Sequence, residues 1–282
     1  HINRVGPGGN VTLENNCLRI HYCIPREKKV SLIVLDSGEE GQLRRCLAAL
    51  QATDWPEMET LILSNRQELP GRTIAVGEIG RFAALNLGAG EATGDYLAFV
   101  DSSVVVEDPG WLRELMMLAQ REDILAAIPA LFDGRGRILH AGYALGMERV
   151  ASCRQQGLPR TAGGWHGLEH TAHNVGAVSA ACLLMRRACF QPFDETYQSD
   201  LGSVEWSLRV RQQGGWFAFT PFSRATAPHG APVLHDGEAH PQEEARITAS
   251  CPSLHDPCYS PLFSHKKADF HLNLDEKGRN VF

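Results

Sequence analysis

A carboxylate followed by two hydroxyl side chains, Asp101, Ser102 and Ser103, stands directly after the apolar run Tyr96–Val100. This run is short and bounded by turn residues, which predicts a buried β-strand. In an open α/β sheet, ligands bind just beyond the carboxyl ends of the strands. A carboxylate there has the oxygen atoms that bind a divalent metal ion or a sugar hydroxyl. The alternative is that Asp101 only opens a turn or caps the helix predicted to begin near Pro109.

Two other predicted strands also end in polar residues. The continuous aliphatic run Val30–Leu35 is typical of a strand covered on both faces, and Asp36 follows it. The run Met58–Leu63 is followed by Ser64 and Asn65. A helix predicted between the two runs makes a β-α-β unit, which crosses over right-handed into a parallel sheet. We therefore expect these strand ends and Asp101 to line one crevice.

The remaining elements predict one α/β fold around that crevice. Apolar periodicity predicts helices at residues 42–51, 81–91, 111–120 and 204–213, and strands at 73–76, 124–131, 138–145, 178–185 and 216–220. A hairpin is predicted at 10–23, long loops are predicted at 147–172 and 226–244, and Pro221 is expected to end the last strand. We divide the chain into a lead-in at 1–28, a main domain at 29–272 and a tail at 273–282.

Composition narrows the class of protein. The formal net charge is −6 and no run of Lys or Arg is present, which argues against a nucleic-acid partner. No apolar run has the length of a membrane span and no signal peptide is visible, so we expect a cytoplasmic chain, free or at the inner face of the membrane. Eight cysteines without metal-like spacing predict reduced thiols. Neither a dinucleotide fingerprint nor a P-loop occurs, so a phosphate would be held another way, most simply by a metal.

Several phrases, in order and spacing, resemble one family over about residues 18–272. They are Val30–Val34 with Leu43–Leu47, Asn86–Asp101, Gly134–Gly142, and Asn174–Arg187 with Phe193–Glu195 and Leu208–Arg209. The chain resembles the family-two glycosyltransferases, which have the nucleotide-sugar-binding GT-A fold, and is most similar to members that build bacterial surface polysaccharides. The resemblance implies a mostly parallel central sheet flanked by helices, with an N-terminal hairpin and an irregular C-terminal segment.

The resemblance also implies a nucleotide and metal site. Asp36 matches the position that contacts the nucleotide base, Ser64 stands where the family usually has an aspartate that reads the base, and Asn65 and Asn86 fall in matching nucleotide-site segments. Asp101 matches the first carboxylate of the D-x-D motif, which binds Mn²⁺ or Mg²⁺ across the donor diphosphate.

Two further metal ligands are implied with less complete matches. Ser103 replaces the second carboxylate of D-x-D, so we expect weak binding of a metal ion in the absence of nucleotide. His229 follows the late Thr-Pro, where a family histidine completes the metal site. The alternative for His229 is a loop histidine without a partner, and His235 and His240 lie in the same polar stretch.

The catalytic base is also replaced. Ser203 stands where the resemblance implies the base carboxylate, and a serine hydroxyl does not accept a proton at neutral pH without help. General-base catalysis contributes about 10² to 10⁴ in rate. Glu205 and Asp200 are the nearby carboxylates that would substitute. The alternative role of Glu205 is to supply negative charge near the start of its helix and to bind the acceptor.

The leading hypothesis is an inverting glycosyltransferase that moves a sugar from a nucleotide-diphosphate donor to a glycan or lipid-linked acceptor in surface polysaccharide synthesis. The second hypothesis is a catalytically impaired or inactive binding module of the same fold. Because the chain begins at His1, other domains of a longer chain are further expected partners. A nucleotidyltransferase is disfavoured, because the segment Asp36–Glu40 is acidic where that class has a glycine-rich basic loop.

Overall fold

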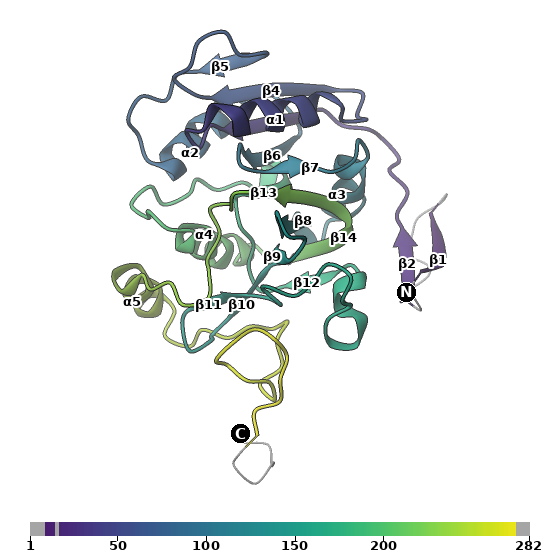
Figure 1. Ribbon diagram of the computed structural model, residues 1–282, viewed down its shortest axis with the longest axis vertical. Coiled ribbons are helices and arrows are strands. Elements are labelled where there is room, and N and C mark those ends of the chain that lie inside the picture. Colours follow the sequence, from purple (N-terminus) through teal and green to yellow (C-terminus); the bar gives the residue numbers. More distant parts are fainter. Residues whose placement is uncertain (1–8, 15–16, 275–282) are drawn as a thin grey trace.

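The computed structural model describes residues 9–14 and 17–274. A ten-stranded sheet crosses the centre of the molecule, with helices on both of its faces (Figure 1). Its strand order is β12 (His173–Val175), β14 (Trp216–Ala227), β8 (Ile124–Asp133), β13 (Cys182–Arg186), β6 (Tyr96–Asp101), β3 (Val30–Leu35), β4 (Met58–Leu63) and β5 (Arg72–Ile74). In addition β7 (Val105–Val106) pairs with β14, and β9 (Ile138–His140) pairs with β8. The expected α/β architecture is confirmed, and the sheet predicted to be mostly parallel contains both parallel and antiparallel pairs.

The half of the sheet that contains β5, β4, β3 and β6 is parallel. All six residues of β3 are buried, which agrees with an aliphatic strand covered on both faces. Alternate residues of β3 point to opposite faces. Val34 packs in the cluster that contains α1 (Glu40–Gln51) and α3 (Trp111–Ala119). Ile33 packs in the cluster that contains α2 (Arg81–Glu91) and α4 (Leu201–Arg211). The parallel pairing places the ends of β3, β4 and β6 at one edge, as predicted.

The other half of the sheet differs from the sequence prediction at two places. The prediction that Pro221 ends the last strand is wrong, because β14 runs on to Ala227. The register shifts between Thr220 and Arg224, and this bulge accommodates a proline that has no N–H to donate. The strand predicted at 138–145 is divided into β9 and β10 (Tyr143–Leu145), which lie in different sheets. Gly142 separates them with a positive φ of 89°.

The long loop predicted at 147–172 contains short regular elements. Strand β11 (Ala151–Cys153) pairs antiparallel with β10, and a 3₁₀ helix spans Trp165–His170. Further along the chain, β13 begins at 182 rather than 178, and it is followed by a single 3₁₀ turn at Arg187–Cys189. Helix α5 (Pro241–Ser250) extends the helix start predicted near 243. The strands and 3₁₀ turns among these elements are too short to show a clear hydrophobic period in the sequence.

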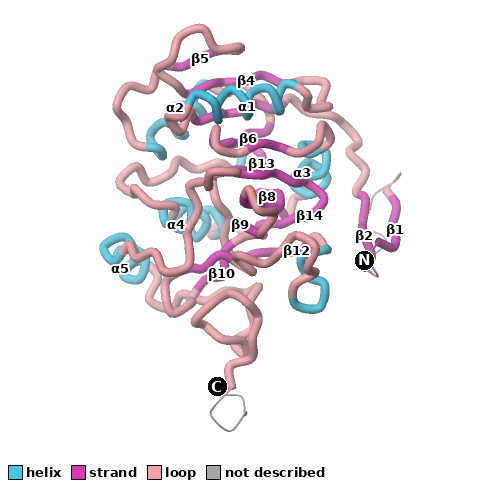
Figure 2. Tube along the Cα trace, in the orientation of Figure 1, coloured by secondary structure: helices cyan, strands magenta, loops and turns pink. Residues whose placement is uncertain are grey.

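The two ends of the described chain lie beside the main sheet (Figure 2). Strands β1 (Asn10–Glu14) and β2 (Cys17–His21) form the predicted antiparallel hairpin, whose expected turn at residues 15–16 lies outside the described residues. The residues after 256 contribute an aromatic cluster that packs on Ala144 and Met147. The eight cysteines are free thiols, as predicted. Within the described ranges, no helix has the length and apolar character needed to cross a membrane.

Candidate functional site

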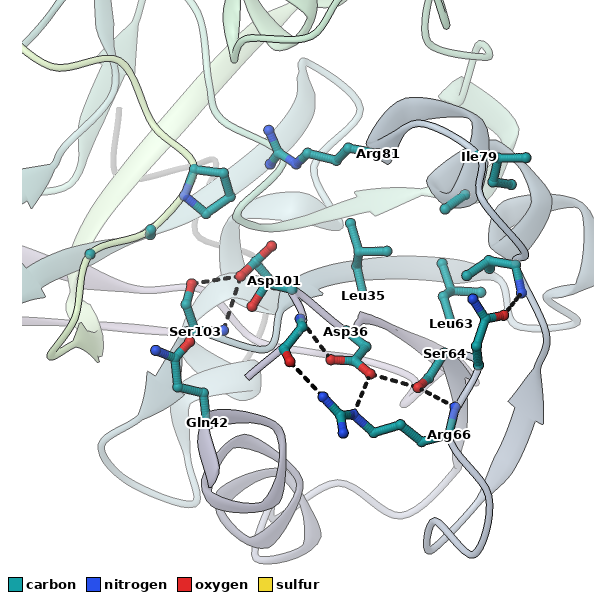
Figure 3. Close-up of a pocket in the computed structure, with 18 of the residues that line it drawn as sticks. Leu35, Asp36, Gln42, Leu63, Ser64, Arg66, Ile79, Arg81, Asp101 and Ser103 are labelled. Carbon is teal, nitrogen blue, oxygen red and sulfur yellow. Dashed lines mark hydrogen bonds and ion pairs between the residues drawn. The ribbon is translucent and has the colours of Figure 1, made fainter. Parts of the chain in front are cut away.

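A cleft of about 900 Å³ opens at the carboxyl ends of β3, β4 and β6 (Figure 3). Asp36, Ser64 and Asp101 all line it, which confirms the prediction that the three strand ends share one crevice. The opposite wall comes from residues 229–232 and from His235, in the loop that follows β14. The cleft therefore combines the rigid edge of a parallel sheet with a wall supplied by a distant part of the chain.

Asp36 is fixed by three donors. Its Oδ2 accepts hydrogen bonds from Ser64 Oγ at 2.6 Å and from Arg66 Nε at 2.9 Å. Its Oδ1 accepts from the backbone N–H of Gly38 at 2.9 Å. Arg66 also donates to the carbonyl oxygen of Gly38 at 2.5 Å, so the ion pair ties the end of β3 to the end of β4. At position 64, a hydroxyl therefore stabilises the Asp36 carboxylate, whereas a carboxylate there would repel it.

Asn65 shapes the wall beside this pair. Its Oδ1 accepts from the backbone N–H groups of Val76 and Gly77 at 3.1 and 2.8 Å, and its Nδ2 donates to the Gly77 carbonyl at 2.8 Å. The side-chain amide thus holds the segment after β5 against the end of β4. Asn65 lines the cleft, as its predicted role requires, although these backbone contacts occupy both ends of its amide.

Asp101 makes a local turn and also faces the cleft. Its Oδ1 accepts from Ser103 N at 2.9 Å and from Ser103 Oγ at 2.6 Å. Its Oδ2 has no hydrogen-bond or ion-pair partner in the described parts of the chain, and the carboxylate is only 3% exposed. The two interpretations of Asp101 are therefore compatible, because one oxygen serves the turn and the other remains for a ligand.

The residues that would hold a metal ion are few. Residues 9–14 and 17–274 contain no group of three His, Cys, Asp or Glu side chains placed to hold one. Asp101, Ser103, His229 and His235 all line the cleft, so a carboxylate with one oxygen unbonded in the described residues, a hydroxyl and two imidazole side chains border the same space. Such a donor set fits an ion that brings the rest of its ligands with it, as a diphosphate-bound ion does.

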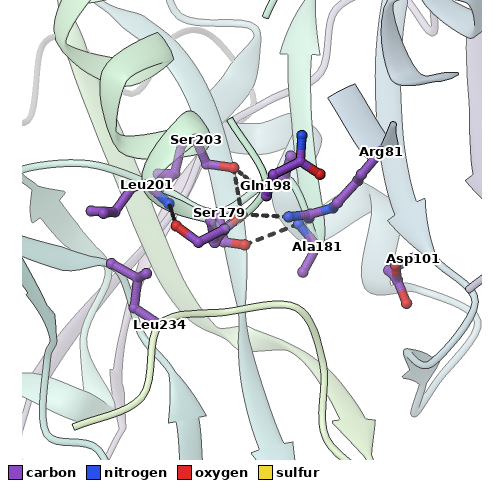
Figure 4. Close-up of polar contacts among 12 residues, drawn as sticks. Arg81, Asp101, Ser179, Ala181, Gln198, Leu201, Ser203 and Leu234 are labelled. Carbon is purple, nitrogen blue, oxygen red and sulfur yellow. Dashed lines mark hydrogen bonds and ion pairs between the residues drawn. The ribbon is translucent and has the colours of Figure 1, made fainter. Parts of the chain in front are cut away.

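Ser203 and Asp200, which the sequence predicts at or near the position of the catalytic base, do not line the cleft. Figure 4 shows Ser203 among polar contacts that include Arg81. Ser203, 1% exposed, donates its hydroxyl to Asp200 Oδ1 at 2.6 Å. Arg81 Nη1 donates to the same oxygen at 2.7 Å, and Tyr143 Oη donates to Asp200 Oδ2 at 2.5 Å. Arg81 lines the cleft whereas Asp200 does not. The Asp200 carboxylate is thus covered by Arg81 and held by three donors, which leaves it no open face toward the cleft.

The other two predicted site residues lie elsewhere. Glu205 forms an i,i+4 ion pair with Arg209 at 2.9 Å on α4 and lines a separate hollow. Asn86 bonds the backbone of Phe193 in both directions, at 2.9 and 2.8 Å, and donates to Glu195 at 3.0 Å. Neither side chain lines the cleft. The catalytic role predicted for Glu205 and the nucleotide-binding role predicted for Asn86 stay predictions.

The prediction did not include two arginines of the cleft. Arg66 directly follows Ser64 and Asn65 in the sequence, so its position next to a predicted strand end was enough to predict that it lines the cleft. Arg81 is the first residue of α2 and reaches Asp200, which lies 119 residues further along the chain. No local sequence pattern predicts so distant a pairing. Together the two guanidinium groups supply positive charge at the cleft wall.

The sheet order and the position of the cleft are those of the GT-A fold. The fold matches the crystal structure of GalNAc-T7 with UDP, GalNAc and Mn²⁺ at a TM-score of 0.61 and 15% identity, covering 85% of this chain and 51% of that one. It matches the mannosyltransferase PcManGT from Pyrobaculum calidifontis, in complex with GDP-Man and Mn²⁺, at a TM-score of 0.52 and 11% identity, covering 76% and 59%. At these identities the likeness concerns the fold.

The chain belongs to glycosyl transferase family 2, whose sequence profile matches residues 31–177. The O-antigen biosynthesis protein RfbC of Myxococcus xanthus is 31% identical over 235 residues, which is 76% of this chain and 18% of that protein. The uncharacterized protein y4gI of Sinorhizobium fredii is 29% identical over 206 residues, 68% of this chain and 22% of that protein. The chain thus spans about a fifth of the length of these curated relatives.

Proposed function

We propose that this chain binds a nucleotide-diphosphate sugar in the cleft and transfers the sugar to a glycan or lipid-linked acceptor in surface polysaccharide synthesis. One observation carries the proposal: Asp36, Ser64 and Asp101 line a single cleft of about 900 Å³ in a family 2 chain. The similarity to an O-antigen biosynthesis protein supports the acceptor class. The UDP and GDP-mannose bound in the two similar structures support a nucleotide-sugar donor.

Each part of the cleft has a proposed role. Asp36, Ser64 and Asn65 face the nucleoside, and the guanidinium groups of Arg66 and Arg81 compensate negative charge of the diphosphate. The Oδ2 of Asp101, together with His229, would hold Mn²⁺ or Mg²⁺. When bound, this ion neutralises charge on the departing diphosphate. Because the chain supplies few metal ligands, we expect the nucleotide to bring the ion with it.

The transfer step is a single displacement in which the acceptor oxygen bonds to the anomeric carbon and the nucleotide diphosphate leaves. The acceptor hydroxyl must lose its proton, and no carboxylate is open to the cleft wall near Ser203, because Arg81 covers Asp200. The missing base would slow transfer by about 10² to 10⁴ relative to a member that has one. We therefore propose a slow transferase that follows the inverting course.

A second candidate function is a binding module without transferase activity. The ion pair between Arg81 and the fully buried Asp200 favours it, because this pair neutralises the nearest carboxylate at the base position. Such a module would keep affinity for the nucleotide and contribute binding or assembly within a longer protein.

Calorimetry and a hydrolysis assay together test both candidates. UDP, GDP and their sugar conjugates would be titrated with and without Mn²⁺, and the same conjugates assayed for hydrolysis and for transfer to glycan acceptors. Metal-dependent binding with slow turnover supports the transferase, and binding without turnover supports the module. Asp101→Asn is the control, and it should lose metal-dependent binding. Absence of binding to every nucleotide would overturn both.

A further inference from the structure

We infer that Tyr143 and Asp200 are positioning residues that couple the cleft to the loop forming its outer wall. This wall loop, residues 228–236, carries the cleft residues His229, Gly230, Ala231, Pro232 and His235. It follows β14 and has no regular secondary structure of its own. Side-chain contacts must therefore determine where it lies.

A continuous series of hydrogen bonds joins the wall loop to the cleft. The backbone N–H of Leu234 donates to Tyr143 Oη at 3.0 Å. Tyr143 Oη donates to Asp200 Oδ2 at 2.5 Å, and Arg81 Nη1 donates to Asp200 Oδ1 at 2.7 Å. The Tyr143 oxygen accepts the amide hydrogen, so its own hydrogen is free to point at the carboxylate. The series therefore begins in the wall loop and ends at a guanidinium group in the cleft.

Burial makes this series rigid. Asp200 is 4% exposed and Tyr143 is fully buried. Burial, with Asp200 beside it, raises the pKa of the Tyr143 hydroxyl well above its usual value, so the hydroxyl keeps its proton. Buried charge-assisted hydrogen bonds are shorter and stronger than neutral ones. Figure 4 shows the Arg81 side chain pointing toward the polar contacts of Ser203.

Two other tethers hold the same loop and provide a comparison. Cys153 Sγ and Gln156 Nε2 each donate to the Leu234 carbonyl at 3.1 Å, and Gln156 Oε1 accepts from Asp236 N at 2.9 Å. In the described ranges, neither side chain bonds to Asp200 or Arg81. Gln156 thus fixes the loop without connecting it to the cleft, whereas Tyr143 does both.

At the cleft end of the series, Arg81 has N–H groups that can bind an anion. Arg81 Nε and Nη2 are buried and have no hydrogen-bond partner among the described residues. Because Asp200 uses only Nη1, an anionic ligand in the cleft can bond to Nε and Nη2 and fix the guanidinium group in the position that holds Asp200, so its binding and the order of the wall loop are thermodynamically coupled. Such coupling is reciprocal: whatever orders the loop strengthens binding at Arg81 by the same factor.

Hydrogen exchange in the absence of any ligand tests the tether itself. Tyr143→Phe removes the acceptor of the Leu234 amide, and we expect exchange in peptides spanning 229–238 to accelerate at least about tenfold. The Ser203 hydroxyl donates to Asp200 and accepts from the backbone N–H of Ala180. Ser203→Ala therefore removes one donor to Asp200 without removing a contact of the wall loop, and we expect a smaller acceleration of exchange in the same peptides. Tyr197→Phe is the control, because within the described residues that hydroxyl makes no hydrogen bond. Unchanged exchange in either Tyr143→Phe or Ser203→Ala, with melting temperatures preserved, would overturn the inference.

A double-mutant cycle tests the coupling, and this arm rests on the proposed function. The affinity for UDP or GDP with Mn²⁺ would be measured for Arg81→Lys combined with Tyr143→Phe, and for Arg81→Lys combined with Gln156→Met. Coupled residues give non-additive effects, so we expect the first pair to deviate from additivity about fivefold or more and the second pair to be additive. Equal behaviour of the two pairs would overturn the coupling. Absence of nucleotide binding by the parent chain would instead overturn the proposed function and leave the exchange result standing.

Discussion

At the scale of single residues, the carboxylates of the site differ in whether an oxygen atom remains unbonded and able to bind a ligand. Asp101 keeps one oxygen without a described partner, whereas Asp36 and Asp200 have each of their oxygens engaged by donors. A residue type alone therefore does not define a role. A carboxylate becomes a ligand for an incoming ion only where the chain leaves an oxygen unbonded.

The first prediction concerns Ser103. Ser103→Asp places a second carboxylate beside Asp101, which should strengthen metal binding several-fold while repelling Asp101 in the absence of metal. We expect the variant to melt at a lower temperature than the parent chain in chelator and to recover with Mn²⁺. Calorimetry with and without UDP then measures the affinity for the ion. Ser103→Asn has a similar size and no charge, so it should show neither effect. A melting temperature insensitive to Mn²⁺ in Ser103→Asp would contradict the placement of the ion.

The second prediction concerns His229, which lines the cleft with Asp101. His229→Ala should weaken nucleotide binding in the presence of Mn²⁺ and leave it unchanged in chelator, because the imidazole acts through the ion. His271→Ala serves as the control, since that side chain is 81% exposed and does not line the cleft. Equal loss of affinity with and without metal would assign His229 a direct contact with the nucleotide instead.

The sequence correctly predicted the position of a cleft residue where that residue directly follows a strand. Asp36, Ser64 and Asp101 were placed correctly because parallel strands end at one edge. It could not place Glu205, because a residue near the start of a helix faces the cleft or the solvent depending on the rotation of that helix. It also could not find Arg81, whose partner Asp200 is remote in sequence.

At the scale of elements, α2 lies close to the sheet because it has a glycine at the contact. A Cβ atom on Gly88 would lie 2.7 Å from Ile33 Cγ2 and 3.0 Å from Leu63 Cδ1. Both neighbours are core residues of the strands that end at the cleft. The separation between α2 and the sheet, and with it the position of Arg81, therefore depends on the absence of a side chain at residue 88.

The third prediction follows from this contact. Gly88→Ala should destabilise the protein by about 1–3 kcal/mol, because the added methyl group overpacks a filled interface. Gly90→Ala, in the same helix and with nothing within 4 Å of the added atom, should be neutral or stabilise by up to about 1 kcal/mol. Urea unfolding of the two variants measures the difference. Equal stability of the two would show that α2 does not rest on the sheet at this point.

The elements themselves were predictable in proportion to their regularity. Strand β4 and helix α2 have the predicted bounds, since each shows a sustained apolar pattern. The bulge after Thr220 was missed because Pro221 normally ends a strand, and the tertiary pairing with β8 overrides that local preference. The break at Gly142 was missed because glycine interrupts an otherwise continuous apolar run without changing its hydrophobicity.

At the scale of the whole molecule, buried ionisable groups make stability depend on pH. Burial lowers the pKa of His140 to about 4, and burial with the nearby Arg154 lowers that of His173 to about 3. Both imidazoles are neutral in the folded state and become protonated in the unfolded state below about pH 6.5. The unfolded state then binds more protons, so these groups make the protein less stable as the pH falls from 6.5 toward 4. Burial raises the pKa of Glu169 to about 7, which acts in the opposite direction over much of the same range.

The fourth prediction isolates His140 from these opposing effects. His140→Gln should reduce the loss of stability between pH 6.5 and 4 by about 1.4 kcal/mol for each pH unit. Unfolding in urea at several pH values, compared with the parent chain, gives this difference directly. His271→Gln, at an exposed position, should keep the pH profile of the parent. A parallel profile for His140→Gln would show that His140 takes up protons in the folded state.

The wall loop also has a consequence for how such proteins diversify. It lies beyond residues 31–177, the part that matches the family profile, yet it forms one side of the cleft. Side chains of Tyr143, Cys153 and Gln156 hold its backbone at Leu234 and Asp236, so the position of the loop does not depend on most of its own side chains. If the cleft binds a nucleotide sugar as proposed, we expect that grafting a different sequence between these anchor points changes which ligand the cleft prefers and leaves the sheet edge at Asp36, Ser64 and Asp101 in place.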